Sequence, residues 1–233
     1  MPVNAYNPER KQYSIVLIGE FNPGMFHPEW FCRNDILSRE DVAFACADTN
    51  KFPLINTQQI TMFKTTQLTV KIETNRFQVV AEKEPLVSLK DFIVKCFDKL
   101  GSYVIKAYGF NYSAHYKIDS DRKYQEIGDK LAPKEYWADL LGKDISGDDR
   151  KGGLCEIQMS EQKVDEKGSI SMLLQPSAQI KPGVFISCND HNEVADDDNF
   201  AEVVIEKIND RFDSSFESMK DLQVSLLTKV CEE

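Results

Sequence analysis

Apolar and polar residues alternate with a period of two along several short stretches, which is typical of β-strands with one buried face. The first stretch is an apolar run that ends at the turn-forming residues 19–24. Three alternating stretches follow, and Thr74-Asn75 forms a turn between the last two. We predict strands at 13–18, 59–64, 67–73 and 76–82. The last three are close enough in sequence to form a meander.

Helical spacing of apolar residues is clearest between Ser88 and Gly101. Ser88 is a good N-cap, and Gly101 suits the end of a helix. A shorter helix is predicted from Pro28, which fits a first turn, and it carries Trp30 and Phe31. Because one face of the longer helix is entirely apolar, we expect that helix to pack on the meander.

The second half of the chain repeats this order of elements. Its first strand leads into Tyr108-Gly109-Phe110-Asn111, which echoes Gly19-Glu20-Phe21-Asn22. Acidic segments at 190–193 and 196–198 are interpreted as a solvated loop and a helix cap before the last helix. The predicted elements are a strand at 103–107, a helical region at 124–142, strands at 154–161, 169–174 and 184–188, and a helix from about 198.

Strand, helix, three strands and helix therefore occur twice. We predict an α+β fold with a tandem pseudo-repeat, in which one curved antiparallel sheet carries helices on one face. Residues 1–11 are an N-terminal tail, and residues 12–101 and 102–233 are two helix-grip-like halves of one shared domain.

The outward face of this sheet follows from alternation along each strand. Its charged residues are Lys71, Glu73, Glu82 and Glu156, so the face is polar and mildly acidic. A protein saddle on the DNA minor groove needs arginine, lysine and apolar wedges instead. A protein ligand or an extended peptide suits this face better.

The order of elements resembles the tandem helix-grip repeat of the TATA-binding proteins. Three local pieces also resemble a sporadically distributed bacterial family of unknown function, whose members are sometimes found near phage-defence genes. These pieces are Ile18-Gly19-Glu20-Phe21-Asn22-Pro23 with Trp30, Tyr108-Gly109-Phe110-Asn111-Tyr112, and Arg211-Phe212 with Phe216. The resemblance implies a role in bacterial defence or toxin control.

The composition of the chain limits the classes of partner that we expect it to bind. The chain has 233 residues, 42% of them hydrophobic, and a net charge of −10. An excess of acidic residues argues against nucleic acid and anionic membranes as partners, since both are bound mainly through lysine and arginine. Six cysteines without a C-x-x-C pair favour buried thiols in a reducing compartment. We expect a cytoplasmic protein with neither a leader nor a membrane span.

We predict a non-catalytic module that binds another protein, as a homo- or hetero-oligomer, and acts as a regulatory, sensor or inhibitory subunit. We expect no catalytic residue, no metal and no cofactor. Tryptophan and half-exposed polar residues on sheets are common in interfaces. The candidate partner-binding residues are Trp30, Trp137, Lys71, Glu73, Glu82, Glu156 and Gln158.

Two alternatives remain open. The first is a metal-dependent nuclease or phosphodiesterase, in which Asp144 or Asp149 joins Glu156 and Gln158 at a magnesium site. It requires acidic side chains that converge in a cleft. The second is a small-molecule binder with an internal pocket between the long C-terminal helix and the sheet.

Overall fold

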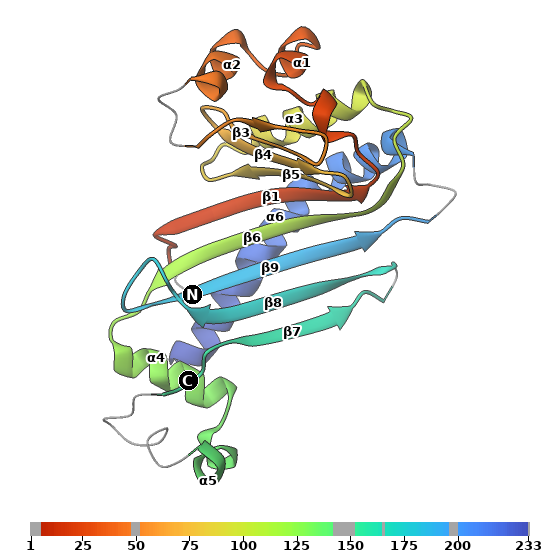
Figure 1. Ribbon diagram of the computed structural model, residues 1–233. Helices are drawn as coiled ribbons and strands as arrows, with labels where there is room; N and C mark the ends of the chain where they lie inside the picture. Colours follow the sequence, from red (N-terminus) through yellow and green to blue (C-terminus); the bar gives the residue numbers. More distant parts are fainter. Residues whose placement is uncertain (1–5, 48–51, 142–151, 165, 196–199, 233) are drawn as a thin grey trace.

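The computed structural model describes residues 6–47, 52–141, 152–164, 166–195 and 200–232. These residues form one curved antiparallel sheet (Figure 1). Its strand order is β2-β3-β4-β5-β1-β6-β9-β8-β7. The strands are β1 (Arg10–Gly19), β2 (Ile55–Asn56), β3 (Ile60–Lys64), β4 (Leu68–Glu73), β5 (Arg76–Ala81), β6 (Ile105–Lys117), β7 (Ile157–Gln162), β8 (Gly168–Pro176) and β9 (Gly183–Glu193).

Helices α3 (Val87–Asp98) and α6 (Ala201–Glu232) lie behind the sheet in Figure 1 and leave the viewed face open. One end of the sheet carries η1 (Pro23–Met25), α1 (Pro28–Arg33) and α2 (Arg39–Cys46). The other end carries α4 (Asp121–Leu131), η2 (Lys134–Tyr136) and α5 (Ala138–Leu141). Among the described helices, none combines the length and apolar character that crossing a membrane requires.

The core lies between the sheet and these helices. Inward residues of neighbouring strands are directly opposite one another, as at Leu17, Phe77 and Ile72 on β1, β5 and β4. All three are completely buried. The predicted alternation is therefore confirmed on the meander, where Leu68, Val70 and Val79 are also buried.

Helix α6 is fixed to the middle of the sheet by aromatic and polar contacts. The Phe216 ring is edge-on to Tyr13 of β1 and Phe110 of β6, at centroid distances of 5.3 and 5.5 Å. Two turns further on, the buried Gln223 side chain accepts a hydrogen bond from the Tyr116 hydroxyl at 2.9 Å and donates one to the Tyr112 carbonyl at 3.1 Å. The buried amide is thus hydrogen-bonded through both of its polar atoms.

Strand β6 is much longer than predicted. The prediction ended it at Ala107, but it continues through Gly109 to Lys117 because it is a central strand, paired with β1 over 105–115 and with β9 over 107–117. A Cβ atom on Gly109 would lie 3.3 Å from the Asn189 amide nitrogen, so the glycine permits a close approach within the sheet. Gly19, in contrast, is the last residue of β1, so the two echoing glycines hold different positions.

Strand β9 also extends beyond its prediction. Asp190 to Glu193 continue the strand instead of forming a solvated loop. Asp190 is 8% exposed, and its carboxylate contacts the Lys163 ammonium, which also donates to the Asn192 side chain at 2.7 Å. This ion pair compensates for burying an acidic residue inside the sheet. Asp196 to Asp198 lie outside the described residues.

The helices differ in detail from the predictions. The sequence pattern did not predict α2 or β2. Helix α3 begins after Leu86, not Ser88, and Leu86 caps it without a side-chain hydrogen bond. The single helical region expected after Tyr124 is divided into α4, η2 and α5. Pro133 explains this division, since proline removes a hydrogen-bond donor and clashes with the preceding turn.

Candidate protein-binding site

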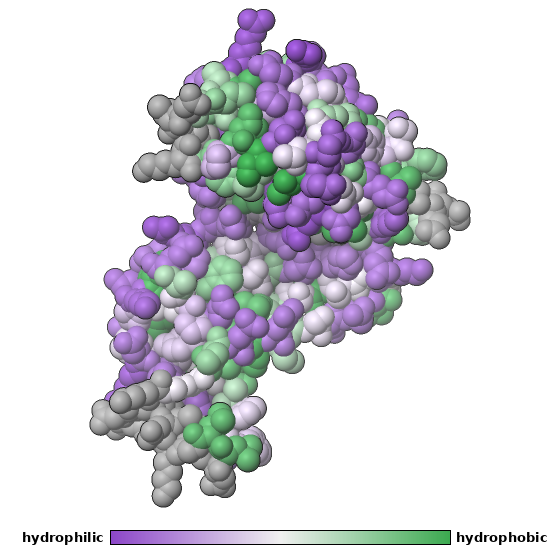
Figure 2. Space-filling view, viewed as in Figure 1, coloured by the Kyte–Doolittle hydropathy of each residue, from purple (hydrophilic) through white to green (hydrophobic). Residues whose placement is uncertain are grey.

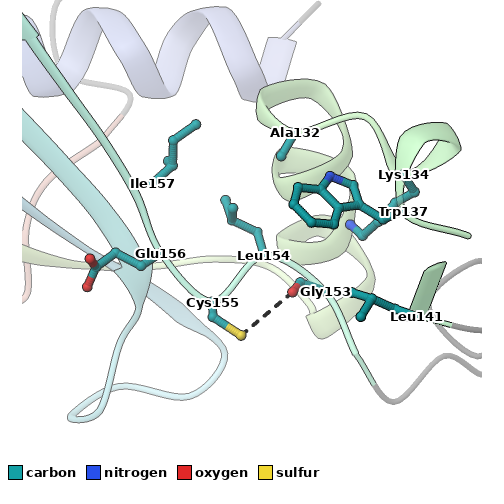
Figure 3. Close-up of a pocket in the computed structure, with 9 residues that line it drawn as sticks. All are labelled: Ala132, Lys134, Trp137, Leu141, Gly153, Leu154, Cys155, Glu156 and Ile157. Atoms are coloured by element: carbon teal, nitrogen blue, oxygen red, sulfur yellow. Dashed lines mark hydrogen bonds between the residues drawn. The ribbon is translucent and has the colours of Figure 1, made fainter.

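A groove opens where β7 begins, beside the short helices at that end of the sheet. Its volume is about 510 Å³. The residues that line it are Ala132, Lys134, Trp137, Leu141, Gly153, Leu154, Cys155, Glu156 and Ile157. In Figure 3 the Trp137 ring and the Leu154 side chain face one another across the groove, and the Glu156 carboxylate points away from it. The groove is therefore mostly apolar.

Helix α4 positions the segment that forms one wall of the groove. The Tyr124 hydroxyl donates a hydrogen bond of 2.7 Å to the Leu154 carbonyl. A Cβ atom on Gly128 would lie 3.0 Å from Cβ of Leu154, so glycine lets the segment approach the helix closely. Burial raises the pKa of Tyr124 to about 12, with a smaller contribution from the nearby Cys155. The tyrosine therefore remains a neutral donor at physiological pH.

Exposed apolar side chains gather around the groove. Trp137 is 49% exposed and Leu141 66% exposed, and Tyr136, Leu140 and Met159 are more exposed still. Figure 2 shows apolar surface over α5 at the lower end of the molecule. Contiguous apolar surface of this kind is uncommon on soluble proteins unless it binds something.

Strand β7 forms an edge of the sheet next to this groove. Within the described residues it is paired on one side only, with β8. An edge strand presents backbone N–H and C=O groups that can pair with a further strand. The strand begins at Ile157, which also lines the groove, so the edge and the groove are continuous.

Charged groups at the groove are few and are partly neutralised. The Lys134 ammonium forms an ion pair with the Asp129 carboxylate, and both groups are largely shielded from solvent. The side-chain oxygen of Gln125 is buried behind Gly153 and has no hydrogen-bond partner among the described residues. The described side chains that line the groove therefore offer mainly apolar contact and hydrogen bonding.

The structure brings together three of the seven candidate residues. Trp137 and Glu156 line the groove, and Gln158 follows on β7. Trp30 lies near the opposite end of the sheet, where its ring is edge-on to Phe26 and Phe31. It is a half-buried part of the aromatic core.

The other three candidates lie on the first half of the sheet. Lys71 and Glu73 on the open face of β4 form an ion pair of 3.0 Å. Glu82 pairs with Lys64 at 3.5 Å. These two ion pairs are distant in the sheet order from β7.

The geometry also bears on the two alternatives. Among the described residues, no group of three histidine, cysteine or acidic side chains is placed to hold a metal ion. Asp144 and Asp149, which the nuclease interpretation requires, lie outside the described residues. The groove lies at α5 and β7, whereas the small-molecule interpretation places a pocket between α6 and the sheet.

Sequence reasoning missed most of the lining of the groove. Leu154 and Ile157 were interpreted as ordinary strand residues and Leu141 as part of a helix. One available signal was the apolar content of 136–141, which follows Pro133 and is too short to bury its own apolar side chains.

The class defined by the fold is an α+β protein built on a single antiparallel sheet of nine strands in its described residues. The sequence matches no protein-family model and no curated protein.

Proposed function

We propose that this protein is a non-catalytic module that binds an extended segment of another protein at the β7 edge. The observation that carries the proposal is the apolar groove at the start of an edge strand. In this binding mode the partner adds a strand through backbone hydrogen bonds and places one apolar side chain in the groove. Trp137 and Leu154 are the main contacts for that side chain.

Several features support the choice of a peptide over a charged ligand. The groove has an apolar lining, and its lysine is already paired with Asp129. The net charge of −10 disfavours polyanions. Backbone groups of β7 recognise any extended chain, whereas the groove selects for an apolar residue at one position.

Other parts of the proposal rest on different observations. A cytoplasmic location is supported by six cysteines that are all free thiols in the structure. A role in bacterial defence or toxin control is supported by the resemblance of the local sequence pieces alone. A tandem repeat is supported by the similar succession of elements after β1 and after β6, the two neighbouring strands at the centre of the sheet.

Selection from a library of displayed random peptides tests the binding mode. The expected result is enrichment of sequences with one apolar residue in a segment of strand-forming residues. Trp137→Ala should weaken binding of a selected peptide at least tenfold, because it removes the largest wall of the groove. Ser160→Pro should also weaken it, since proline removes one backbone N–H group from the edge strand.

Phe44→Ala is the matched control, because Phe44 is an exposed aromatic residue on α2, at the far end of the sheet. Binding should be unchanged in this variant. Selection of no peptide, or binding that survives both Trp137→Ala and Ser160→Pro, would refute the proposed site. Magnesium-dependent cleavage of nucleic acid by the purified protein would refute the non-catalytic assignment.

A further inference from the structure

The open face of the sheet contains a broad region without formal charge. Three rows of five residues run across strands β1, β6, β9, β8 and β7, as their pairing register defines. In strand order the rows are Gln12-Ser113-Ser187-Leu173-Gln158, Ser14-Asn111-Asn189-Ser171-Ser160 and Val16-Gly109-His191-Ser169-Gln162. We call these fifteen residues the neutral face.

This composition departs from that of the whole chain. Charged residues make up 28% of the sequence, yet the neutral face contains no Asp, Glu, Lys or Arg. Sheet faces that are exposed to solvent normally carry charged side chains, which keep a protein soluble. On the adjoining strands β3 to β5, lysines are present but are paired with Glu73 and Glu82. Arg10 of β1 and Arg76 of β5 lie on the same face outside the three rows, so the lack of charge is a property of the neutral face itself.

The neutral face is recessed along its β1 margin, next to the first half of the sheet. Ser14 is 6% exposed and Val16 is 8% exposed, although no described helix lies over them. Figure 2 shows the surface hollowed across the middle of this side of the molecule. Neighbouring strands lie roughly 4.8 Å apart, so each row presents its side chains at regular intervals across the sheet.

The central row is built around an asparagine pair. The Asn189 amide donates a hydrogen bond of 2.7 Å to the Asn111 side-chain oxygen. This bond fixes both side chains and leaves an amide N–H group on Asn111 and an oxygen on Asn189 available to a ligand. Ser14 and Ser171 flank the pair, and each hydroxyl both donates and accepts.

We propose that the neutral face binds an uncharged, polyhydroxylated chain, namely a neutral oligosaccharide. Sugar hydroxyl groups donate and accept hydrogen bonds, as do the amides and hydroxyls of the central row. Leu173 and the Phe185 ring, which lies 4.8 Å from that of His115, provide apolar contact for the C–H face of a sugar ring. Nucleic acid fits less well, because its phosphates require basic side chains.

This site shares strand β7 with the proposed peptide site, but none of its fifteen residues lines the groove, and it is tested with a different class of ligand. Backbone amide chemical shifts of the protein are measured during titration with cellohexaose, maltohexaose and N-acetylchitohexaose. Hexagalacturonate and an oligothymidylate are the anionic comparisons. We expect at least one neutral saccharide to bind with a dissociation constant of about 1 mM or tighter and to shift resonances of β6, β8 and β9.

Two matched substitutions locate the site. Ser171→Leu should weaken saccharide binding at least tenfold, because it removes a hydroxyl from the central row. Ser225→Leu, at an exposed position on α6, should leave the affinity unchanged. Asn189→Leu is a second variant that removes the asparagine pair, and Trp137→Ala should retain saccharide binding. Circular dichroism confirms that each variant is folded.

Three results would overturn the inference. The first is no shift with any neutral saccharide at millimolar concentration. The second is tighter binding of hexagalacturonate or oligothymidylate, which would assign the face to an acidic polysaccharide or to nucleic acid. The third is equal affinity of Ser171→Leu and Ser225→Leu, which would place the saccharide elsewhere.

Discussion

Glu84 links the sheet to the long C-terminal helix through three donors. Its carboxylate accepts a hydrogen bond of 2.5 Å from the buried hydroxyl of Tyr13 on β1. The ammonium groups of Lys220 on α6 and Lys11 on β1 lie 3.0 and 3.1 Å away. The Tyr13 hydrogen bond, followed by those of the two lysines, lowers the pKa of Glu84 to about 2. Burial, more than this contact, raises the pKa of Tyr13 well above its usual value.

This lowered pKa predicts a loss of stability in acid. A carboxylate whose pKa is lower in the folded state stabilises the fold above its unfolded pKa of roughly 4.3. That contribution is lost as the pH falls toward about 2. Glu84→Gln should therefore be less stable than the wild type near pH 6, and the difference should disappear near pH 2. Because Glu84 is 42% exposed, we expect a difference of at most about 1 kcal/mol.

Urea denaturation of the two proteins between pH 2 and pH 7 measures this difference. Lys83→Gln, at the exposed neighbouring position, is the control for a change in net charge. A difference between wild type and Glu84→Gln that stays constant from pH 7 to pH 2 would contradict the assigned role of the carboxylate.

At the scale of elements, α4 and the end of α6 depend on each other. The Lys123 and Lys130 ammonium groups of α4 donate to the carbonyls of Cys231 and Val230, at 2.7 and 3.1 Å. These carbonyls belong to the last turn of α6, where they have no partner within the helix. The two lysines also place positive charge at the negative end of the helix dipole.

Replacing both lysines should loosen that turn and the groove wall that α4 supports. We expect Lys123→Met/Lys130→Met to increase amide hydrogen exchange in the last turn of α6 and in α4. The free energy of unfolding should fall by about 1 to 2 kcal/mol. Lys117→Met, at the exposed last residue of β6, is the control. Unchanged exchange in the last turn of α6 would show that these contacts contribute little.

An element could be predicted from the sequence when the pattern that determines it lies within a few neighbouring residues. Strands β3 to β5 were predicted well, because alternation and the turn at Thr74-Asn75 lie within a few residues. The length of β6 was not predicted, since a glycine such as Gly109 normally indicates a break. Pairing with two strands that are distant in sequence keeps β6 extended. Helix α2 has weak apolar periodicity, and it is held in place by the Asp41 contact with Thr66 at 2.7 Å, which no local pattern reveals.

The candidate site was predicted even less completely. Trp137, Glu156 and Gln158 were singled out as residue types common in interfaces, without any indication that they are neighbours. The groove results from tertiary contacts such as that between Tyr124 and Leu154, which are 30 residues apart. The open face was predicted to be polar and mildly acidic, because the lack of charge across β1, β6, β9, β8 and β7 appears only when the register places these strands side by side.

At the scale of the whole molecule, the residues before and after Gly101 form one continuous sheet. Strands β1 and β6 pair antiparallel over most of the length of β1, and α6 lies across both. Phe216 is in contact with Tyr13 on β1 and with Phe110 on β6, so a single side chain of the C-terminal helix bridges the two halves. Neither half can unfold without exposing apolar surface of the other.

We therefore expect one cooperative unfolding transition and a shared response to Phe216→Ala. Removing this completely buried ring should lower the free energy of unfolding by roughly 3 to 5 kcal/mol, through lost apolar contact and the remaining cavity. Hydrogen exchange followed by mass spectrometry should show protection falling by the same amount in β4 and β5 as in β8 and β9. Loss confined to β6, β8 and β9 would mean that the halves unfold separately, because the C-terminal helix would then stabilise only its own half.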